Sequence, residues 1–154
     1  MRRVPVVMAW VVNAFENSSE HSEYYLDLDT GDVKFFCPMD FPEHAGAMKR
    51  FDSQPQRYIR LPKKERDFAV KIRKDFVESL EETDLKELLA KSVESELKFR
   101  NALMEFLPER RRWYSFQSER SGEFLKNWFL ERGIELVEKE PPPVPGGAPD
   151  IRGS

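Results

Sequence analysis

Hydrophobic residues recur along most of the chain at the spacing of amphipathic helices. This spacing predicts helices over residues 4–15, 64–80, 84–97 and 99–107. The third helix opens with Asp84 and Glu87 at the spacing of a capping box, and Pro108 ends the fourth. Beyond the proline, aromatic residues at helical spacing predict one long or two short helices that end at Gly133, a residue suited to the left-handed position after a helix.

Alternation of hydrophobic and polar residues predicts short strands between the helical segments. The strands are expected over residues 24–28, 33–36, 57–61 and 134–137. The first two form a hairpin, because Gly31 supplies the positive φ that a tight turn needs. Residues 37–56 contain several prolines and few periodic hydrophobic residues, so we expect a long irregular connection there.

These elements predict an α+β fold in which a small three-stranded antiparallel sheet packs against four to five helices. The chain of 154 residues is 40% hydrophobic and long enough for one core without a metal or disulfide. We expect a single domain over residues 1–139, followed by a disordered tail rich in proline and glycine over residues 140–154.

The N-terminus has the basic start and hydrophobic stretch of a signal peptide, but its continuation differs. Glu16, Glu20 and Glu23 follow directly, and the hydrophobic stretch is shorter than the roughly 20 residues that span a membrane. Cys37 is the single cysteine, which excludes an intrachain disulfide and suits a reducing compartment. We therefore predict a cytoplasmic protein without membrane association.

Charge is unevenly distributed, although the net charge is only −3. Residues 49–74 contain ten basic and three acidic side chains, with aromatic residues between them. Such a pattern is found in nucleic-acid-binding modules, and equally in a solvated strand edge and helix face, which is the commoner case. The candidate binding residues of this segment are Arg57, Tyr58, Arg60, Lys63, Lys64, Lys71 and Lys74.

A second candidate binding site, for an anion or a partner, consists of Arg112, Trp113 and Arg120. Arg112 is the last of three consecutive arginines. Arginine beside an aromatic ring can hold a phosphate or carboxylate, but aromatic residues at helical spacing are more often part of a core. Arg120 lies on the hydrophobic stripe of its helix and therefore needs a partner, for which Asp27 and Asp75 are the candidates.

The sequence contains no pattern that assigns a catalytic residue, a metal site or a cofactor. The triplet Asp29-Thr30-Gly31 is that of aspartic proteases, but it occurs once and a hairpin turn accounts for it. Cys37, His21 and His44 are too few for a structural zinc site. They could serve cysteine nucleophilic catalysis only if the fold joined them, so we favour a structural or loop role.

Several short motifs follow one another in a fixed order. They are Tyr25-Leu26-Asp27, Thr30-Gly31-Asp32-Val33, Arg57-Tyr58-Ile59-Arg60-Leu61-Pro62, Asp75-Phe76, Phe99-Arg100, Trp113-Tyr114-x-Phe116, Arg120, Trp128-Phe129 and Gly133-Ile134. This arrangement resembles the bacterial uncharacterised protein family 0158 over roughly residues 4–137. The resemblance implies a small cytosolic protein, and it brings no activity, cofactor or catalytic residue with it.

Together, these features favour a non-enzymatic binding or regulatory module that acts on a protein partner. The alternative is a nucleic-acid-associated protein that uses residues 49–74, which requires the basic side chains to form one exposed face. A third hypothesis, an unrecognised hydrolase, requires Cys37 or a pair of carboxylates beside His21 or His44.

Overall fold

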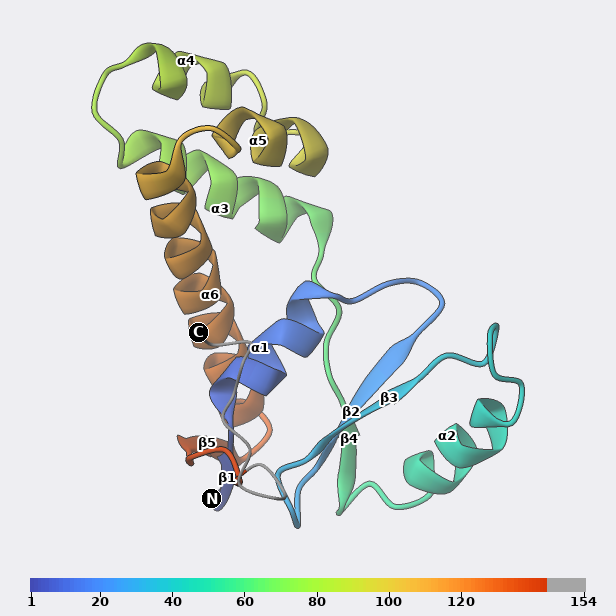
Figure 1. Cartoon of the computed structure of the whole chain (residues 1–154). Helices are drawn as coiled ribbons and strands as arrows, with labels where there is room; N and C mark the ends of the chain where they lie inside the picture. The colour runs from blue at the N-terminus through green and yellow to red at the C-terminus, as the bar shows by residue number, and fades with distance from the viewer. Residues whose placement is uncertain (144–154) are drawn as a thin grey trace.

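A long helix connects a helical end and a sheet end of the protein in the computed structural model, which describes residues 1–143 (Figure 1). The helices are α1 (Met8–Glu16), α2 (His44–Asp52), α3 (Arg66–Glu78), α4 (Asp84–Ala90), α5 (Glu96–Leu103) and α6 (Leu107–Leu130). The strands are β1 (Arg2–Val6), β2 (Glu23–Asp27), β3 (Val33–Phe36), β4 (Tyr58–Arg60) and β5 (Ile134–Glu138). The predicted α+β class is confirmed. From residue 144 onward, the predicted tail lies outside the described residues.

The predicted three-stranded antiparallel sheet is present, with strand order β3-β2-β4. Leu26 in β2 lies opposite Val33 on one side and Ile59 on the other. The hairpin turn has the expected left-handed glycine, since φ of Gly31 is +79°. A Cβ atom at this position would lie 2.1 Å from the carbonyl oxygen of Pro5, so the turn packs tightly against β1.

The N-terminal segment differs from the prediction of a helix over residues 4–15. Residues 2–6 form β1, which pairs in parallel with β5 in a separate two-stranded sheet, and α1 starts only at Met8. Val4 and Val6 point to the same side and are buried, as alternating strand residues should be. The prediction failed because the partner strand lies some 130 residues away, beyond the reach of local periodicity.

The helices of the helical end also have different limits from those predicted. In place of the helix expected over residues 84–97, the structure has α4 and the start of α5. A hydroxyl group caps the N-terminus of each helix. Thr83 Oγ1 accepts a hydrogen bond from Lys86 N, and Ser95 Oγ accepts one from Lys98 N, each at 3.2 Å. Pro108 does not end a helix but lies in the first turn of α6, where its missing N–H costs no hydrogen bond.

Residues 37–56 are not irregular throughout, because they contain α2. This short helix has no buried residue and is held against the sheet by contacts at both of its ends, at His44 and at Phe51 and Asp52. The Phe51 ring stacks on Tyr58 with 3.9 Å between centroids, and Asp52 accepts a hydrogen bond of 2.8 Å from the Tyr25 hydroxyl. Tertiary contacts, and not helical periodicity, therefore stabilise α2.

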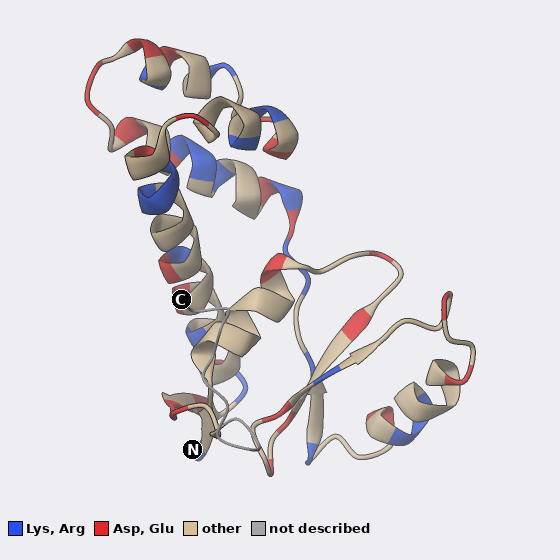
Figure 2. Ribbon diagram, viewed as in Figure 1, with Lys and Arg blue, Asp and Glu red and all other residues tan. Residues whose placement is uncertain are grey.

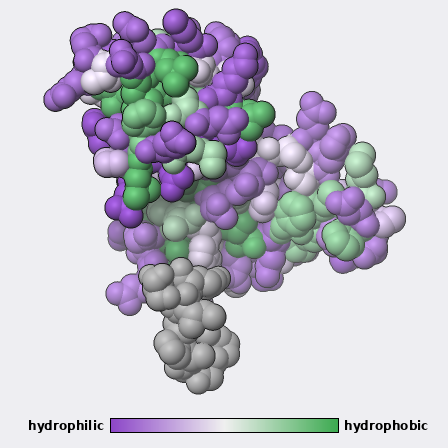
Figure 3. All heavy atoms as spheres, turned by 45° about the horizontal axis from the view of Figure 1, so that its top comes forward, coloured by the Kyte–Doolittle hydropathy of each residue, from purple (hydrophilic) through white to green (hydrophobic). Residues whose placement is uncertain are grey.

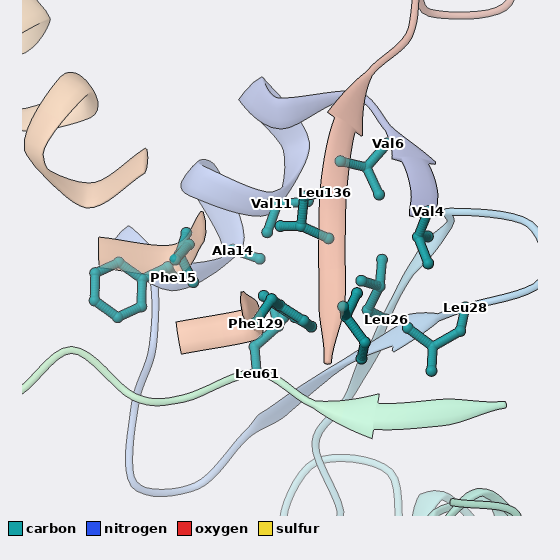
Figure 4. Packing of buried hydrophobic residues seen from close by; sticks show 12 residues of the cluster. Val4, Val6, Val11, Ala14, Phe15, Leu26, Leu28, Leu61, Phe129 and Leu136 are labelled. Atoms are coloured by element: carbon teal, nitrogen blue, oxygen red, sulfur yellow. The ribbon is translucent and has the colours of Figure 1, made fainter. Parts of the chain in front are cut away.

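Two clusters of buried hydrophobic residues form the core. The sheet-end cluster contains Val4, Val6, Val11, Ala14, Phe15, Leu26, Leu28, Leu61, Leu125, Phe129, Ile134 and Leu136 (Figure 4). The helical-end cluster contains Ile72, Phe76, Val77, Leu80, Leu85, Leu89, Phe99, Leu103 and Trp113. Phe68 of α3 packs against both clusters, so α3 and α6 join the two ends.

Candidate docking surface

The basic segment over residues 49–74 is largely neutralised by carboxylates, most of which belong to other segments; Figure 2 marks the basic and acidic residues along the ribbon. The ion pairs join Arg57 to Asp27 and Asp29, Arg60 to Asp52 and Glu23, Lys63 to Glu23, Lys64 to Glu16, Arg66 to Glu94, and Lys71 to Asp75. Lys74 forms no ion pair within residues 1–143. The predicted basic residues therefore contribute little free charge to this surface.

One group of these residues serves to hold α2 on the sheet. Asp52 accepts bonds of 3.1 and 2.6 Å from Arg60 in addition to the one from Tyr25. Burial and the bond to Asp52 raise the pKa of Tyr25 to about 12, while the Arg60 guanidinium holds the pKa of Asp52 below its usual value. Arg57 and Tyr58 stack on each other nearby, at 5.1 Å between guanidinium carbon and ring centroid.

The second predicted group, Arg112, Trp113 and Arg120, is divided among different environments. Trp113 is a core residue, with its ring 5.3 Å from Phe76 and 4.9 Å from Phe99 between centroids. Arg120 forms an ion pair of 2.8 Å with Asp75, which is one of the two partners considered from the sequence. Arg112 is exposed near the start of α6.

Substitution of Arg120 by alanine is expected to lower the free energy of unfolding by about 1 kcal/mol, because the pair with Asp75 is only partly buried. Asp75 also accepts a bond from Lys71, whose ammonium is the first cause that holds the pKa of Asp75 low. Urea unfolding of Arg120→Ala, Asp75→Ala and the double variant measures the coupling, which we expect at about 0.5–1 kcal/mol. A coupling of zero would show that Lys71 alone satisfies Asp75.

The structure brings together two of the three residues considered for cysteine chemistry. The backbone N–H of Cys37 donates to His44 Nδ1 at 2.9 Å, and the Cys37 thiol donates to Asp40 Oδ2 at 3.5 Å. His21 is exposed in the loop between α1 and β2. The imidazole thus binds the backbone of Cys37, and the thiol is directed to the carboxylate of Asp40 instead of the imidazole.

Exposed hydrophobic side chains gather where α5 turns into α6. The exposed residues of this region, here called the corner surface, are Leu97, Met104, Phe106, Leu107 and Tyr114. Leu97 of α5 and Met104, the C-cap residue of this helix, are seven residues apart and lie on the same side, as do Leu107 and Tyr114 of α6. Figure 3 shows hydrophobic atoms at the helical end, surrounded by hydrophilic ones. Periodicity had assigned Leu97, Phe106 and Leu107 to buried helix faces, so sequence reasoning missed this surface.

Basic side chains without carboxylate partners lie on the same two helices as the corner surface. They are Lys98, Arg100, Arg110, Arg111 and Arg112, none of which forms an ion pair within the part of the chain that the structure describes. Residues 96–114 contain these five basic side chains and three acidic ones. Arginine and exposed aromatic or methionine residues are characteristic of protein interfaces. The corner surface thus combines apolar area with free positive charge.

Two other kinds of site find no support in the described residues. No cluster of three or more histidine, cysteine or acidic side chains is placed to hold a metal ion there. Nor does any helix among residues 1–143 have both the length and the hydrophobicity to cross a membrane.

Comparison with known proteins gives a match to the uncharacterised protein family UPF0158 over residues 2–148. The chain is also similar to the UPF0158 protein PA5073 of Pseudomonas aeruginosa. The identity is 24% over 140 residues, which cover 86% of this chain and 90% of the relative. No solved structure matches the chain.

Proposed function

The chain belongs to the uncharacterised protein family UPF0158, and we propose that it is a non-enzymatic binding module whose protein partner docks on the corner surface. The observation that supports this proposal is the gathering of exposed apolar side chains beside unpaired arginines in a protein of net charge −3. Exposed apolar area favours association through the hydrophobic effect. A cytoplasmic location is part of the proposal, because a single cysteine suits a reducing compartment.

The chemistry of the corner surface defines the kind of partner. Met104 and Leu107 would be covered by apolar side chains, and Arg110 and Arg111 would pair with carboxylates at the rim of the interface. The expected partner is therefore a protein segment that presents apolar residues flanked by acidic ones. We do not extend this proposal to nucleic acid, because the basic residues over 49–74 are mostly paired with carboxylates.

The proposal is tested by affinity capture from a bacterial lysate with the full chain and two double variants. Met104→Ser with Leu107→Ser removes apolar area from the corner surface. Met39→Ser with Leu130→Ser is the matched control, since Met39 and Leu130 are similarly exposed, at 67% and 40% against 60% and 42%. We expect the corner variant to lose captured proteins at least about tenfold, because two interface anchors contribute about 1 kcal/mol or more each, and the control variant to retain them.

Treatment with nuclease separates the alternatives. Capture that survives nuclease and depends on Met104 and Leu107 supports the proposal. Equal capture by both variants would contradict it, and capture that nuclease abolishes would favour nucleic-acid association.

A further inference from the structure

Arg73 of α3 is a buried cation without a carboxylate partner. Arg73 is 6% exposed. Ile72, Phe76 and Val77 of the same helix belong to the helical-end cluster. Arg73 Nε donates to the carbonyl oxygen of Val93 at 2.6 Å. Within the described residues, neither η nitrogen has a hydrogen-bond partner, and no carboxylate oxygen lies within 4.0 Å. This differs from the exposed arginines Arg2, Arg60 and Arg66, which are all paired.

Arg73 lines two cavities, one beside Lys64, Arg66 and Glu94 and the other beside Phe99, Arg100 and Trp113. Among the described residues, every fully enclosed side-chain nitrogen or oxygen has a hydrogen-bond partner, so the unbonded η nitrogens retain accessible surface. The second of these cavities has a volume of about 300 Å³ and lies at the junction of α1, α3, α5 and α6. The other polar groups that line it are Asn13, Glu16, Asn17, Glu96, Arg100, Tyr114, Gln117 and Ser118. Phe99 and Trp113 supply apolar walls.

One of the two carboxylates that line this cavity, Glu16, already has hydrogen-bond partners. Glu16 accepts hydrogen bonds from Lys64 Nζ at 2.5 Å and Gln117 Nε2 at 2.7 Å, and a further one from Ser121 Oγ. Lys64 balances its charge, so Glu16 has no free charge to offer to Arg73.

The charges that remain around the cavity leave an excess of one positive charge. Arg73 and Arg100 are unpaired within residues 1–143, and Glu96 is the one remaining carboxylate of this lining. Burial lowers the pKa of Arg73, and the charges of Glu96 and Glu94 oppose this effect only in part, since Arg66 acts in the same direction as burial. An arginine nevertheless stays protonated, so its buried charge lacks a full counter-charge in the protein.

We propose that this cavity binds a small oxyanion, the carboxylate or phosphate group of a compact ligand, through the guanidinium groups of Arg73 and Arg100. The planar fork of a guanidinium binds both kinds of oxyanion through paired N–H bonds. The amide of Asn13 and the second N–H of the Gln117 amide, whose first N–H donates to Glu16, can donate further bonds. A volume of about 300 Å³ restricts the ligand to a small molecule. The site borders the corner surface, since Arg100 and Tyr114 also line the cavity, but its central cation Arg73 lies within the fold.

Titration of the full chain with inorganic phosphate and, separately, with succinate tests this site. The readouts are the NMR resonances of Arg73 Nε–H and the Trp113 indole N–H, with sodium chloride at equal ionic strength as the control. We expect saturable shifts with one or both anions, a rise in the thermal midpoint, and no saturable response to chloride. The anion that binds more tightly identifies the phosphate or carboxylate class.

Three variants locate the binding. Arg73→Gln should weaken binding by about tenfold or more and Arg100→Gln by about threefold or more, because each removes charge-assisted hydrogen bonds. Arg50→Gln, on exposed α2, is the control and should bind as the unaltered chain does. If Arg73→Gln does not fold, Arg73→Lys keeps the charge and should still weaken binding. An absence of saturable shifts with both anions, or equal affinity in the Arg100→Gln and Arg50→Gln variants, would overturn the proposal.

Discussion

Replacement of Asp27 by alanine is expected to lower the free energy of unfolding by about 2–4 kcal/mol. Asp27 is 3% exposed and organises the hairpin turn. Its Oδ1 atom accepts from Asp29 N at 2.9 Å, Thr30 N at 3.3 Å and Arg57 Nε at 3.2 Å, and its Oδ2 atom accepts from Arg57 Nη2 at 3.0 Å. Its removal takes the acceptor away from the two N–H groups of the turn and from the Arg57 guanidinium, and chemical denaturation of both proteins measures the loss.

The contribution of Asp27 should also depend on pH. Burial alone would raise the pKa of Asp27, but the hydrogen bonds from Arg57 and the two backbone N–H groups hold it below its usual value. A lowered pKa in the folded state stabilises the protein fully above the unfolded value of about 4. This stabilisation is lost as the pH falls through the folded pKa.

Asp27→Asn is the control that isolates this charge. Asp52 and Asp75 also have lowered pKa values, so the unaltered protein loses stability in acid for more than one reason. The difference in unfolding free energy between the unaltered protein and Asp27→Asn should therefore shrink as the pH falls below about 4. A difference that does not change with pH would show that packing, and not the charge of Asp27, stabilises the turn.

Replacement of Trp113 by alanine is expected to cost about 3–5 kcal/mol, the range for removal of a large aromatic residue from a core. Trp113 is 6% exposed and joins α6 to α3 and α5 through its contacts with Phe76 and Phe99. The cavity left in the helical-end cluster should loosen that end first, which hydrogen exchange of α4 and α5 would detect.

Trp113→Phe distinguishes a core role from a surface role. A phenylalanine keeps most of the aromatic contact with Phe76 and Phe99, so its cost should be about 1–2 kcal/mol. If Trp113→Ala changed the unfolding free energy by less than about 1 kcal/mol, the residue would not be part of the core, and the hypothesis of an aromatic ligand site would be favoured.

The local elements were predictable where one signal dominates. Turn chemistry predicts the hairpin with Gly31 and the end of the strand before Pro62. Helical spacing predicts the long α6, which ends before Gly133. α2 was not predictable, because its stability depends on the stacking of Phe51 on Tyr58. The split between α4 and α5 follows from the cap at Ser95, a signal that the hydrophobic spacing concealed.

The candidate binding residues were less predictable than the elements. The sequence identified the abundant charge of residues 49–74, but a count of charges cannot show which carboxylates lie within reach. The sequence also does not distinguish Arg73 from the other basic residues of this segment. Only its burial at the junction of α1, α3, α5 and α6 distinguishes it from its paired neighbours.

By itself, the amino-acid sequence determined the α+β class, the antiparallel hairpin and the family of this protein, because periodicity, turn residues and motif order are local or linear properties. The tertiary structure decided which charges remain unpaired and which apolar residues stay exposed. The parallel pairing of β1 with β5, the neutralisation of Lys64 by Glu16 and the isolation of Arg73 all depend on segments distant in sequence. Their energies are set by distance and burial, which exist only once the chain is folded.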